Sequence, residues 1–255
     1  MPQCRWFLIP SPLLGPASWR AVAEELRRIG HVATVARTTM TTPADPDHVA
    51  PWLDELADHE RDDDLPVVVA AHSAAVPRLP MAVRRLLDDG WPVVGMICVD
   101  GRFPDGRSFA DCGPFYAELL DGLVRPDDYM PPWPRWWGSL VTSLVFEPGA
   151  RREVFDEARP VPRAWFDQGC PVPALPDEVG RGYLGFGVGY EQSRLLARDA
   201  GWVTYRMTGE HLHQVVSPQA VAATLVSFAA CLCRAEPPKP TDDPTDEAPG
   251  GRSAA

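Results

Sequence analysis

Lysine is nearly absent from this sequence: Lys239 is the only one, and arginine supplies almost all of the positive charge. Acidic residues outnumber basic ones by 35 to 24, which gives a formal net charge of -11. The basic residues do not gather into a patch. A protein with this charge distribution is a poor partner for nucleic acid or for an anionic membrane surface. We therefore expect neither as a partner.

Long apolar runs are also missing. No stretch approaches the roughly 20 residues of a membrane-spanning helix. The opening segment, MPQCRWFLIP, lacks a hydrophobic region long enough for a signal peptide. We therefore expect a cytoplasmic protein.

The six cysteines form no pair of CxxC motifs and no Cys/His group with the spacing of a zinc site. They are expected to be reduced and mostly buried. The sequence also lacks a glycine-rich dinucleotide fingerprint. No cofactor and no metal are therefore implied.

What the sequence does contain is an alternation of short apolar runs with amphipathic segments of helical length. This pattern predicts an α/β fold with a mostly parallel sheet of about six strands and helices on both faces. With 255 residues, 45% of them hydrophobic, the chain can bury the core of a single domain. The expected strands are 5–10, 31–36, 66–71, 93–100, 183–188 and 203–208, and the expected helices are 18–30, 74–90 and 217–233.

About eighty residues separate the fourth and fifth predicted strands, which is too many for a simple connection. We interpret residues 102–180 as an inserted cap, within a domain that spans residues 1–235. The cap contains the segment YMPPWPRWWG, in which Trp133, Trp136 and Trp137 crowd together. They could border an apolar substrate or pack only on one another. The tail, residues 236–255, is acidic and rich in proline, and is expected to be disordered.

One serine stands where a buried strand gives way to a helix, in the stretch VVVAAHSAAVPRLP. Ser73 would sit on a sharp turn above the carboxyl edge of the sheet, where open α/β sheets place their sites. Such a turn needs small neighbours. Here the G-x-S-x-G pattern becomes Ala71-His72-Ser73-Ala74-Ala75, in which alanine still fits. The setting is that of a nucleophile.

Three segments in this order resemble the α/β-hydrolase fold family over nearly the whole chain before the tail. FLIPSPLLGPASW stands at the family's oxyanion loop, AAHSAA at its nucleophile elbow, and GEHLHQVVSPQAVA at its histidine segment. The family order of nucleophile, acid and histidine implies a catalytic triad built on Ser73. Similar short proteins occur in bacterial secondary metabolism, which makes a natural-product tailoring role a further expectation from the resemblance.

The histidine segment offers two candidates. By the family pattern the base is His211, which follows a strand and precedes the helix that begins at Pro218. It would take the proton of Ser73 while a carboxylate orients its other ring nitrogen. His213 could line the pocket, or both histidines could simply bond loop groups. His72, beside the serine, is expected to point away from it, although it remains among the residues that could border the substrate.

The acid has two candidate positions. Asp100 ends a very apolar strand and must find a partner or solvent, so it is preferred. It could instead cap the turn before Gly101. Glu191 lies nearer to the family's usual place, after the following strand, but it is about one residue out of register.

The oxyanion loop departs from the family pattern, because Pro10-Ser11 replaces His-Gly and Pro12 follows. Proline has no N–H to donate. Ala74 can still donate one, and a second donor would have to come from Leu13, from the Ser11 hydroxyl or from a shifted loop. Losing one donor typically costs a factor of about 10² to 10³ in rate.

These features predict a serine hydrolase acting on an ester or thioester of an apolar small molecule. The same fold also hosts lyases and cyclases that use the pocket without an acyl-enzyme. A third possibility is an inactive member that binds a ligand. The sequence indicates no oligomeric state.

Overall fold

The computed structural model describes residues 3–37 and 65–232 of the chain. The predicted tail at 236–255 lies outside these residues. Six parallel strands form one sheet in the order β2-β1-β3-β4-β7-β8, and every expected strand is present. The strands are β1 (Arg5–Ile9), β2 (Val32–Val35), β3 (Val67–His72), β4 (Val93–Val99), β7 (Gly180–Phe186) and β8 (Val203–Met207).

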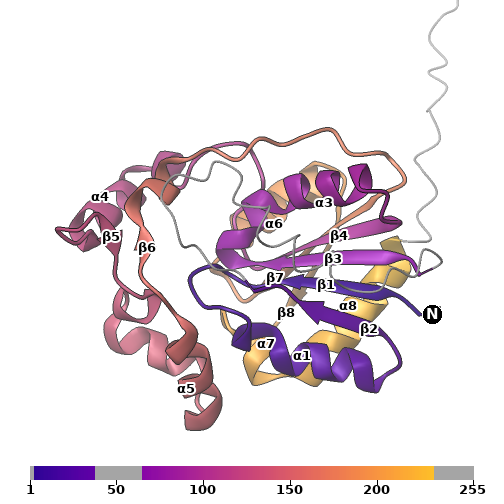
Figure 1. Cartoon of the computed structure of the whole chain (residues 1–255), viewed down its shortest axis with the longest axis horizontal. Coiled ribbons are helices and arrows are strands. Elements are labelled where there is room, and N and C mark those ends of the chain that lie inside the picture. Colours follow the sequence, from indigo (N-terminus) through magenta and orange to yellow (C-terminus); the bar gives the residue numbers. More distant parts are fainter. Residues whose placement is uncertain (1–2, 38–64, 233–255) are drawn as a thin grey trace, which may run out of the picture.

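Helices cover both faces of the sheet (Figure 1). One face packs against α1 (Ala17–Arg28) and α8 (Pro218–Leu232), and the other packs against α3 (Leu79–Asp88) and α6 (Glu191–Asp199). No helix in the described residues is long and apolar enough to cross a membrane.

Burial on both faces explains why the central strands β1, β3 and β4 are mainly apolar, whereas the edge strand β8 is partly exposed. Successive side chains of a strand point to opposite faces. In β1, Trp6 and Leu8 therefore join the core beneath α1 and α8, while Phe7 and Ile9 join the core beneath α3. Since neither face of these central strands meets water, they need few polar residues, as expected for a parallel sheet.

The segment after Ser73 differs from the continuous helix expected at 74–90. Residues Ser73–Arg78 form a 3₁₀ helix, η1, and the α-helix α3 begins only at Leu79. Pro77 lies inside η1 and has no N–H for a helical hydrogen bond. The chain therefore leaves the elbow as a tight 3₁₀ turn before it settles into an α-helix.

Most of the cap segment, residues 102–179, lies beyond the carboxyl ends of the strands, and its last residues, after Asp167, run back past α3 to the start of β7 (Figure 1). The only sheet pairing of the cap segment in the described residues is antiparallel and short, between β5 (Tyr129–Met130) and β6 (Val161–Pro162). The rest consists of helices and turns, most of them short. The elements are η2 (Ala110–Cys112), α4 (Pro114–Leu123), η3 (Trp133–Arg135), η4 (Gly138–Leu144), α5 (Pro148–Glu157) and η5 (Arg163–Asp167).

The cap segment is held to the sheet domain through α1. The Glu157 carboxylate accepts a hydrogen bond from the backbone N–H of Ala17, the first residue of α1. Arg20 extends from α1 to form ion pairs with Glu153 and Glu157 of α5. Since α1 has no acidic residue in its own first turn, Glu157 supplies the negative charge that a helix N-terminus favours.

A close backbone approach joins the ends of β3 and β4. A Cβ atom added at Gly101 would lie 2.3 Å from the backbone carbonyl oxygen of Ser73. The side chain of Val76 is also closer than van der Waals contact allows. Only glycine therefore lets the chain leaving β4 pass beside the turn that carries Ser73.

Replacing Gly101 by alanine should lower the free energy of unfolding by about 3 kcal/mol, because the added methyl group overpacks a buried backbone contact. Thermal or urea unfolding measures the change. Gly122→Ala in α4 is the matched control, since an added Cβ there meets nothing within 4 Å. That variant should be neutral or stabilised by up to about 1 kcal/mol. Equal stability of the two variants would contradict the contact described at Gly101.

Candidate active site

Three predicted residues meet at the carboxyl edge of the sheet. Ser73 follows the last residue of β3, and Asp100 follows the last residue of β4. His211 lies after β8, shortly before the four-residue helix α7 (His213–Val216). In the sheet register His72 is paired with Val99, so the two strands end side by side. The topology therefore brings together residues that are distant in the sequence.

Their side chains form a continuous hydrogen-bonded relay. The Nε2 atom of His211 lies 2.9 Å from Oγ of Ser73, and its Nδ1 atom lies 2.7 Å from Oδ2 of Asp100. An ionised carboxylate only accepts hydrogen bonds, so it favours the tautomer with the proton on Nδ1. The free lone pair on Nε2 then faces the serine hydroxyl, as a general base requires.

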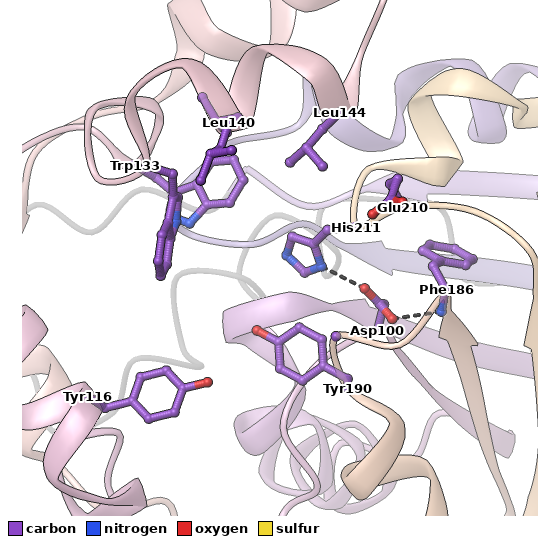
Figure 2. A pocket seen from close by; sticks show the side chains of 12 residues that line it. Asp100, Tyr116, Trp133, Leu140, Leu144, Phe186, Tyr190, Glu210 and His211 are labelled. Carbon is purple, nitrogen blue, oxygen red and sulfur yellow. Dashed lines mark hydrogen bonds and ion pairs between the residues drawn. The ribbon is translucent and has the colours of Figure 1, made fainter.

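Asp100 is fixed by a second contact. It is 1% exposed, and its Oδ1 atom accepts a hydrogen bond of 2.7 Å from the backbone N–H of Phe186 at the end of β7. The pairing of Asp100 with His211 and Phe186 therefore satisfies both oxygens of a carboxylate that is almost fully buried. The bond to His211 is drawn together with the bond to Phe186 in Figure 2.

Strained backbone conformations accompany two of these residues. Ser73 has φ 58° and Asp100 has φ 40°, both in the left-handed region that side-chain-bearing residues rarely adopt. Such conformations persist only where surrounding structure enforces them, and they cluster at functional sites. The conformation of Ser73 agrees with the sharp turn expected from the sequence, whereas nothing in the sequence indicated the one at Asp100.

Glu191, the alternative acid, lies outside the relay. It is the first residue of α6, and its carboxylate forms an ion pair with Arg194 one helical turn later, at 2.6 Å. Its side chain is 31% exposed. The bond to Arg194 lowers the pKa of Glu191. Because helix α6 begins at this residue, the side chain is directed along the helix surface and not toward His211.

His72 supports the loop that carries His211. The ring is fully buried, and Nε2 lies 2.9 Å from the backbone carbonyl oxygen of His211, so this nitrogen carries the proton. Burial lowers the pKa of His72 well below its usual value and keeps the ring neutral. Trp19 packs edge-on against it. The residue thus points away from the Ser73 side chain, as expected, and acts on the backbone of the histidine loop.

His213 begins α7 and packs against the ring of Phe186, with the ring centroids 5.5 Å apart. Burial lowers its pKa as well. It does not contribute to the cavity beside His211, and nor does His72. The structure therefore places neither of these two histidines where the sequence suggested a substrate contact.

The predicted oxyanion loop turns in on itself. The backbone N–H groups of Leu14 and Gly15 both donate to the carbonyl oxygen of Ser11, at 2.9 and 3.0 Å. The N–H of Leu13 is directed at Oγ of Ser11, at 3.4 Å. Pro12 has no N–H to offer. Ala74 is buried directly after Ser73, where its N–H precedes the first hydrogen bond of η1.

A cavity of about 340 Å³ opens beside His211 and Asp100 (Figure 2). This volume lies in the range of small-molecule sites. Its wall is mainly apolar and comes largely from the cap segment, with Glu210 as an additional charged residue. The lining residues are Asp100, Tyr116, Trp133, Trp137, Leu140, Val141, Leu144, Phe186, Gly189, Tyr190, Glu210 and His211.

The three tryptophans of the cap segment separate into two groups. Trp133 and Trp137 line the cavity, and the ring of Trp133 lies 5.9 Å from that of His211. Trp136 instead donates its indole N–H to the carbonyl oxygen of Pro131 and packs on Phe166. Trp133 and Trp137 therefore lie where a molecule in the cavity would contact them, whereas Trp136 packs within the cap segment.

Two phenols in the cavity were not anticipated. Tyr190, in the loop between β7 and α6, packs its ring 5.4 Å from that of His211, with the planes tilted by 33°. The pKa of Tyr190 is raised, chiefly by burial and then by the neighbouring Tyr116 and Asp100, while interaction with the Ser73 side chain opposes the rise. Figure 2 shows the hydroxyl groups of Tyr190 and Tyr116 on the same side of the cavity. The only sequence feature that pointed to Tyr190 is its place directly before Glu191, one of the two candidate acid positions.

In the described residues, no group of three or more histidine, cysteine, aspartate or glutamate side chains could hold a metal ion. The polar contacts around Ser73 come from protein side chains and backbone. The arrangement is suited to proton transfer between a hydroxyl group and an imidazole, next to an apolar cavity.

No family model matches the sequence, and no curated protein matches it. Solved structures do. An extracellular α/β-hydrolase from a Paenibacillus species is similar with a TM-score of 0.71 and 15% identity, over 88% of this chain and 98% of that one. Polyneuridine aldehyde esterase is similar with a TM-score of 0.64 and 15% identity, over 89% of this chain and 100% of that one. A pyrethroid hydrolase from Sphingobium faniae JZ-2 is similar with a TM-score of 0.67 and 18% identity, over 90% of this chain and 98% of that one. The sheet order, the helices on both faces and these likenesses agree: the chain has the α/β-hydrolase fold.

Proposed function

We propose that this protein is a serine hydrolase that cleaves an ester or thioester of an apolar small molecule. The observation that carries the proposal is the relay from Ser73 through His211 to Asp100, next to a mainly apolar cavity. Nucleophile, base and orienting acid are each within hydrogen-bonding distance of the next, which is the geometry that covalent acyl transfer requires.

In the proposed reaction, Oγ of Ser73 attacks the acyl carbon and its proton passes to Nε2 of His211. The electron pair of the carbonyl double bond moves onto the carbonyl oxygen. Asp100 stabilises the imidazolium that forms. As the intermediate collapses, His211 gives the proton to the leaving group, which departs with the bonding electrons. Water then repeats the sequence on the acyl-enzyme and releases the acid.

The developing oxyanion needs hydrogen-bond donors. Ala74 can offer its backbone N–H, but Pro12 cannot, and the nearby N–H groups of the loop face Ser11. The hydroxyl of Tyr190 is an available second donor, because Tyr190 lines the cavity with its ring 5.4 Å from that of His211. A donor held in a site poor in water stabilises charge strongly. We assign this role to Tyr190 as part of the proposal.

The substrate class follows from the cavity wall. The side chains of Trp133, Trp137, Leu140 and Leu144 present a surface that suits a flat or long-chain apolar group. A natural product modified by a tailoring enzyme would fit this description. The cap segment supplies most of these apolar side chains, and a bound apolar group would displace water from the same space.

A lyase or cyclase is the second candidate, and the inward-facing loop at Ser11–Leu13 is the observation that favours it. A reaction that forms no tetrahedral acyl intermediate would not need the donors that this loop lacks. In that case His211 would act as the acid or base while Ser73 merely held the substrate. The short contact between Ser73 and His211 favours the hydrolase.

The first experiment measures hydrolysis of p-nitrophenyl esters of increasing acyl length by wild type, Ser73→Ala and His211→Ala. We expect turnover by wild type and a loss of at least about 10³-fold in kcat for both variants, because either change breaks the relay. A fluorophosphonate probe should label wild type at Ser73. Absence of both labelling and turnover in a folded wild-type protein would contradict the hydrolase proposal and favour the lyase or cyclase.

The identity of the acid is tested by Asp100→Asn with Glu191→Gln as its matched control. The amide at position 100 would stabilise the wrong tautomer of His211, and kcat should fall by up to about 10⁴-fold. Glu191→Gln should change kcat less than about threefold, because its partner is Arg194. A comparable loss in both variants would contradict the role assigned to Asp100.

Tyr190→Phe tests the second donor, since it removes the hydroxyl and keeps the ring beside His211. We expect kcat to fall by about 10² or more with little change in KM, as for the loss of an oxyanion donor. Tyr116→Phe is the control, a phenol that lines the same cavity from α4, and it should alter KM more than kcat. If Tyr190→Phe keeps the wild-type kcat and is labelled by the fluorophosphonate at the wild-type rate, the donor lies elsewhere.

A further inference from the structure

Arg78 is a buried arginine close to the proposed nucleophile. It is the last residue of η1, five residues after Ser73, and it is only 3% exposed. Its guanidinium carbon lies 4.1 Å from the ring centroid of Trp165 in η5. Arg78 thus points from the sheet domain into the cap segment, with one face of the guanidinium on an indole.

Among the described residues, no carboxylate forms an ion pair with Arg78. The charged or ionisable side chains that act on it are Cys170 and Arg102, and the second of these carries the same charge. Burial raises the pKa of the Cys170 thiol, which keeps that group neutral. Burial lowers the pKa of Arg78 to about 10, so it is still positive at neutral pH. A buried charge without a counter-charge is costly, and a single cation–π contact offsets only part of that cost.

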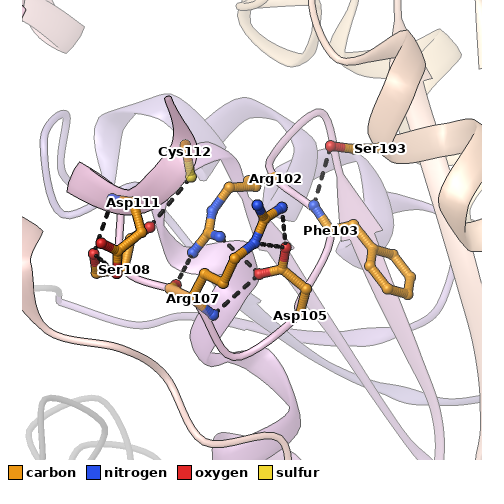
Figure 3. Close-up of polar contacts among 8 residues, drawn as sticks. All are labelled: Arg102, Phe103, Asp105, Arg107, Ser108, Asp111, Cys112 and Ser193. Atoms are coloured by element: carbon orange, nitrogen blue, oxygen red, sulfur yellow. Dashed lines mark hydrogen bonds and ion pairs between the residues drawn. The ribbon is translucent and has the colours of Figure 1, made fainter. Parts of the chain in front are cut away.

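The neighbouring Arg102 has a counter-charge, but that counter-charge is shared. Figure 3 shows the Asp105 carboxylate between two guanidinium groups. Its oxygens lie 2.7 Å from Nη1 of Arg102 and 2.6 Å from Nη2 of Arg107. Arg102 also donates to the carbonyl oxygen of Arg107, while its Nε atom is buried with no partner in the described part of the chain. This cluster therefore has an excess of positive charge and unused donors.

The cluster lies near the substrate cavity. The guanidinium carbon of Arg102 lies 5.4 Å from the ring centroid of Phe109, and the Phe109 ring lies 6.4 Å from that of Tyr116, which lines the cavity. Five residues of 3₁₀ helix advance by about 10 Å, so Arg78 is set back from Ser73 by about this distance along η1. An anion near Arg78 would therefore be separated from the reacting ester by an intervening chain of about this length.

We propose that Arg78 and Arg102 bind a carboxylate carried by the substrate at the end remote from the scissile bond. This inference rests on the proposed hydrolase function and narrows its substrate to a half-ester or half-thioester with an apolar middle. A guanidinium group matches a carboxylate in a planar, two-point hydrogen bond. Such a carboxylate would supply the counter-charge that Arg78 lacks and accept from the free donor of Arg102.

The test compares two series of p-nitrophenyl esters with equal chain lengths. One series consists of monoesters of linear dicarboxylic acids, and the other of the corresponding monocarboxylic esters. At the chain length that reaches Arg78, wild type should prefer the charged ester at least tenfold in kcat/KM. In Arg78→Met this preference should fall to near one, mainly through a higher KM for the charged ester. Arg78→Lys should keep part of the preference, because it retains the charge but not the planar fork.

Arg84→Met is the matched control, an arginine on the surface of α3 that pairs with Asp88 and should leave the preference as in wild type. If wild type hydrolyses neutral esters and prefers them to charged ones at every length, the carboxylate site is wrong and the hydrolase proposal stands. If wild type hydrolyses no ester, the hydrolase proposal fails. The carboxylate site is then tested by measuring the melting temperature with free linear dicarboxylates. A dicarboxylate that raises the melting temperature of wild type but not of Arg78→Met supports the site. If no linear dicarboxylate has this effect, the site is overturned.

Discussion

The hydrogen bond between His211 and Asp100 ties the last loop of the domain to the middle of the sheet. Asp100 is held in turn by the backbone of Phe186, and the chain just after it passes against the backbone of Ser73. Three strands therefore meet at one carboxylate. The strained backbone at Asp100 is stable only because these contacts enforce it. The fold thus uses the end of β4 as the fixed point from which both the histidine and the serine are placed.

Because Asp100, the proposed acid, follows β4, the loop after β7 is free for another role. In this chain it carries Tyr190 against the ring of His211. Gly187 in the same loop has φ 64°, and an added Cβ there would lie 2.4 Å from the carbonyl oxygen of Gly209, so the loops after β7 and β8 are in close contact. The loop after β7 thus brings a phenol to the cavity, next to the position of the alternative acid Glu191.

The sequence was sufficient to predict the six strands and the elbow at Ser73, because a strand buried on both faces and a turn flanked by alanine each have local patterns. His211 also had a local signal in its segment. The choice between Asp100 and Glu191 had no local signal in the sequence, because it depends on which strand ends lie next to the histidine loop. The separation of Trp136 from Trp133 and Trp137 likewise depends on packing. Arg78 gave no signal, because a lone arginine in a helix is ordinary until its burial is known.

The attachment of the cap segment to α1 has a consequence for how the protein responds to salt. Arg20 and Glu153 are both largely exposed, and dissolved ions weaken such pairs, whose interactions fade over about 8 Å at physiological ionic strength. The bond from Glu157 to the start of α1 is better shielded. Dissolved salt would therefore weaken the outer part of this contact before the inner part. The cap segment, which lines the cavity, would then be held less firmly to the sheet domain as the ionic strength rises, even when the reacting groups themselves do not respond to salt.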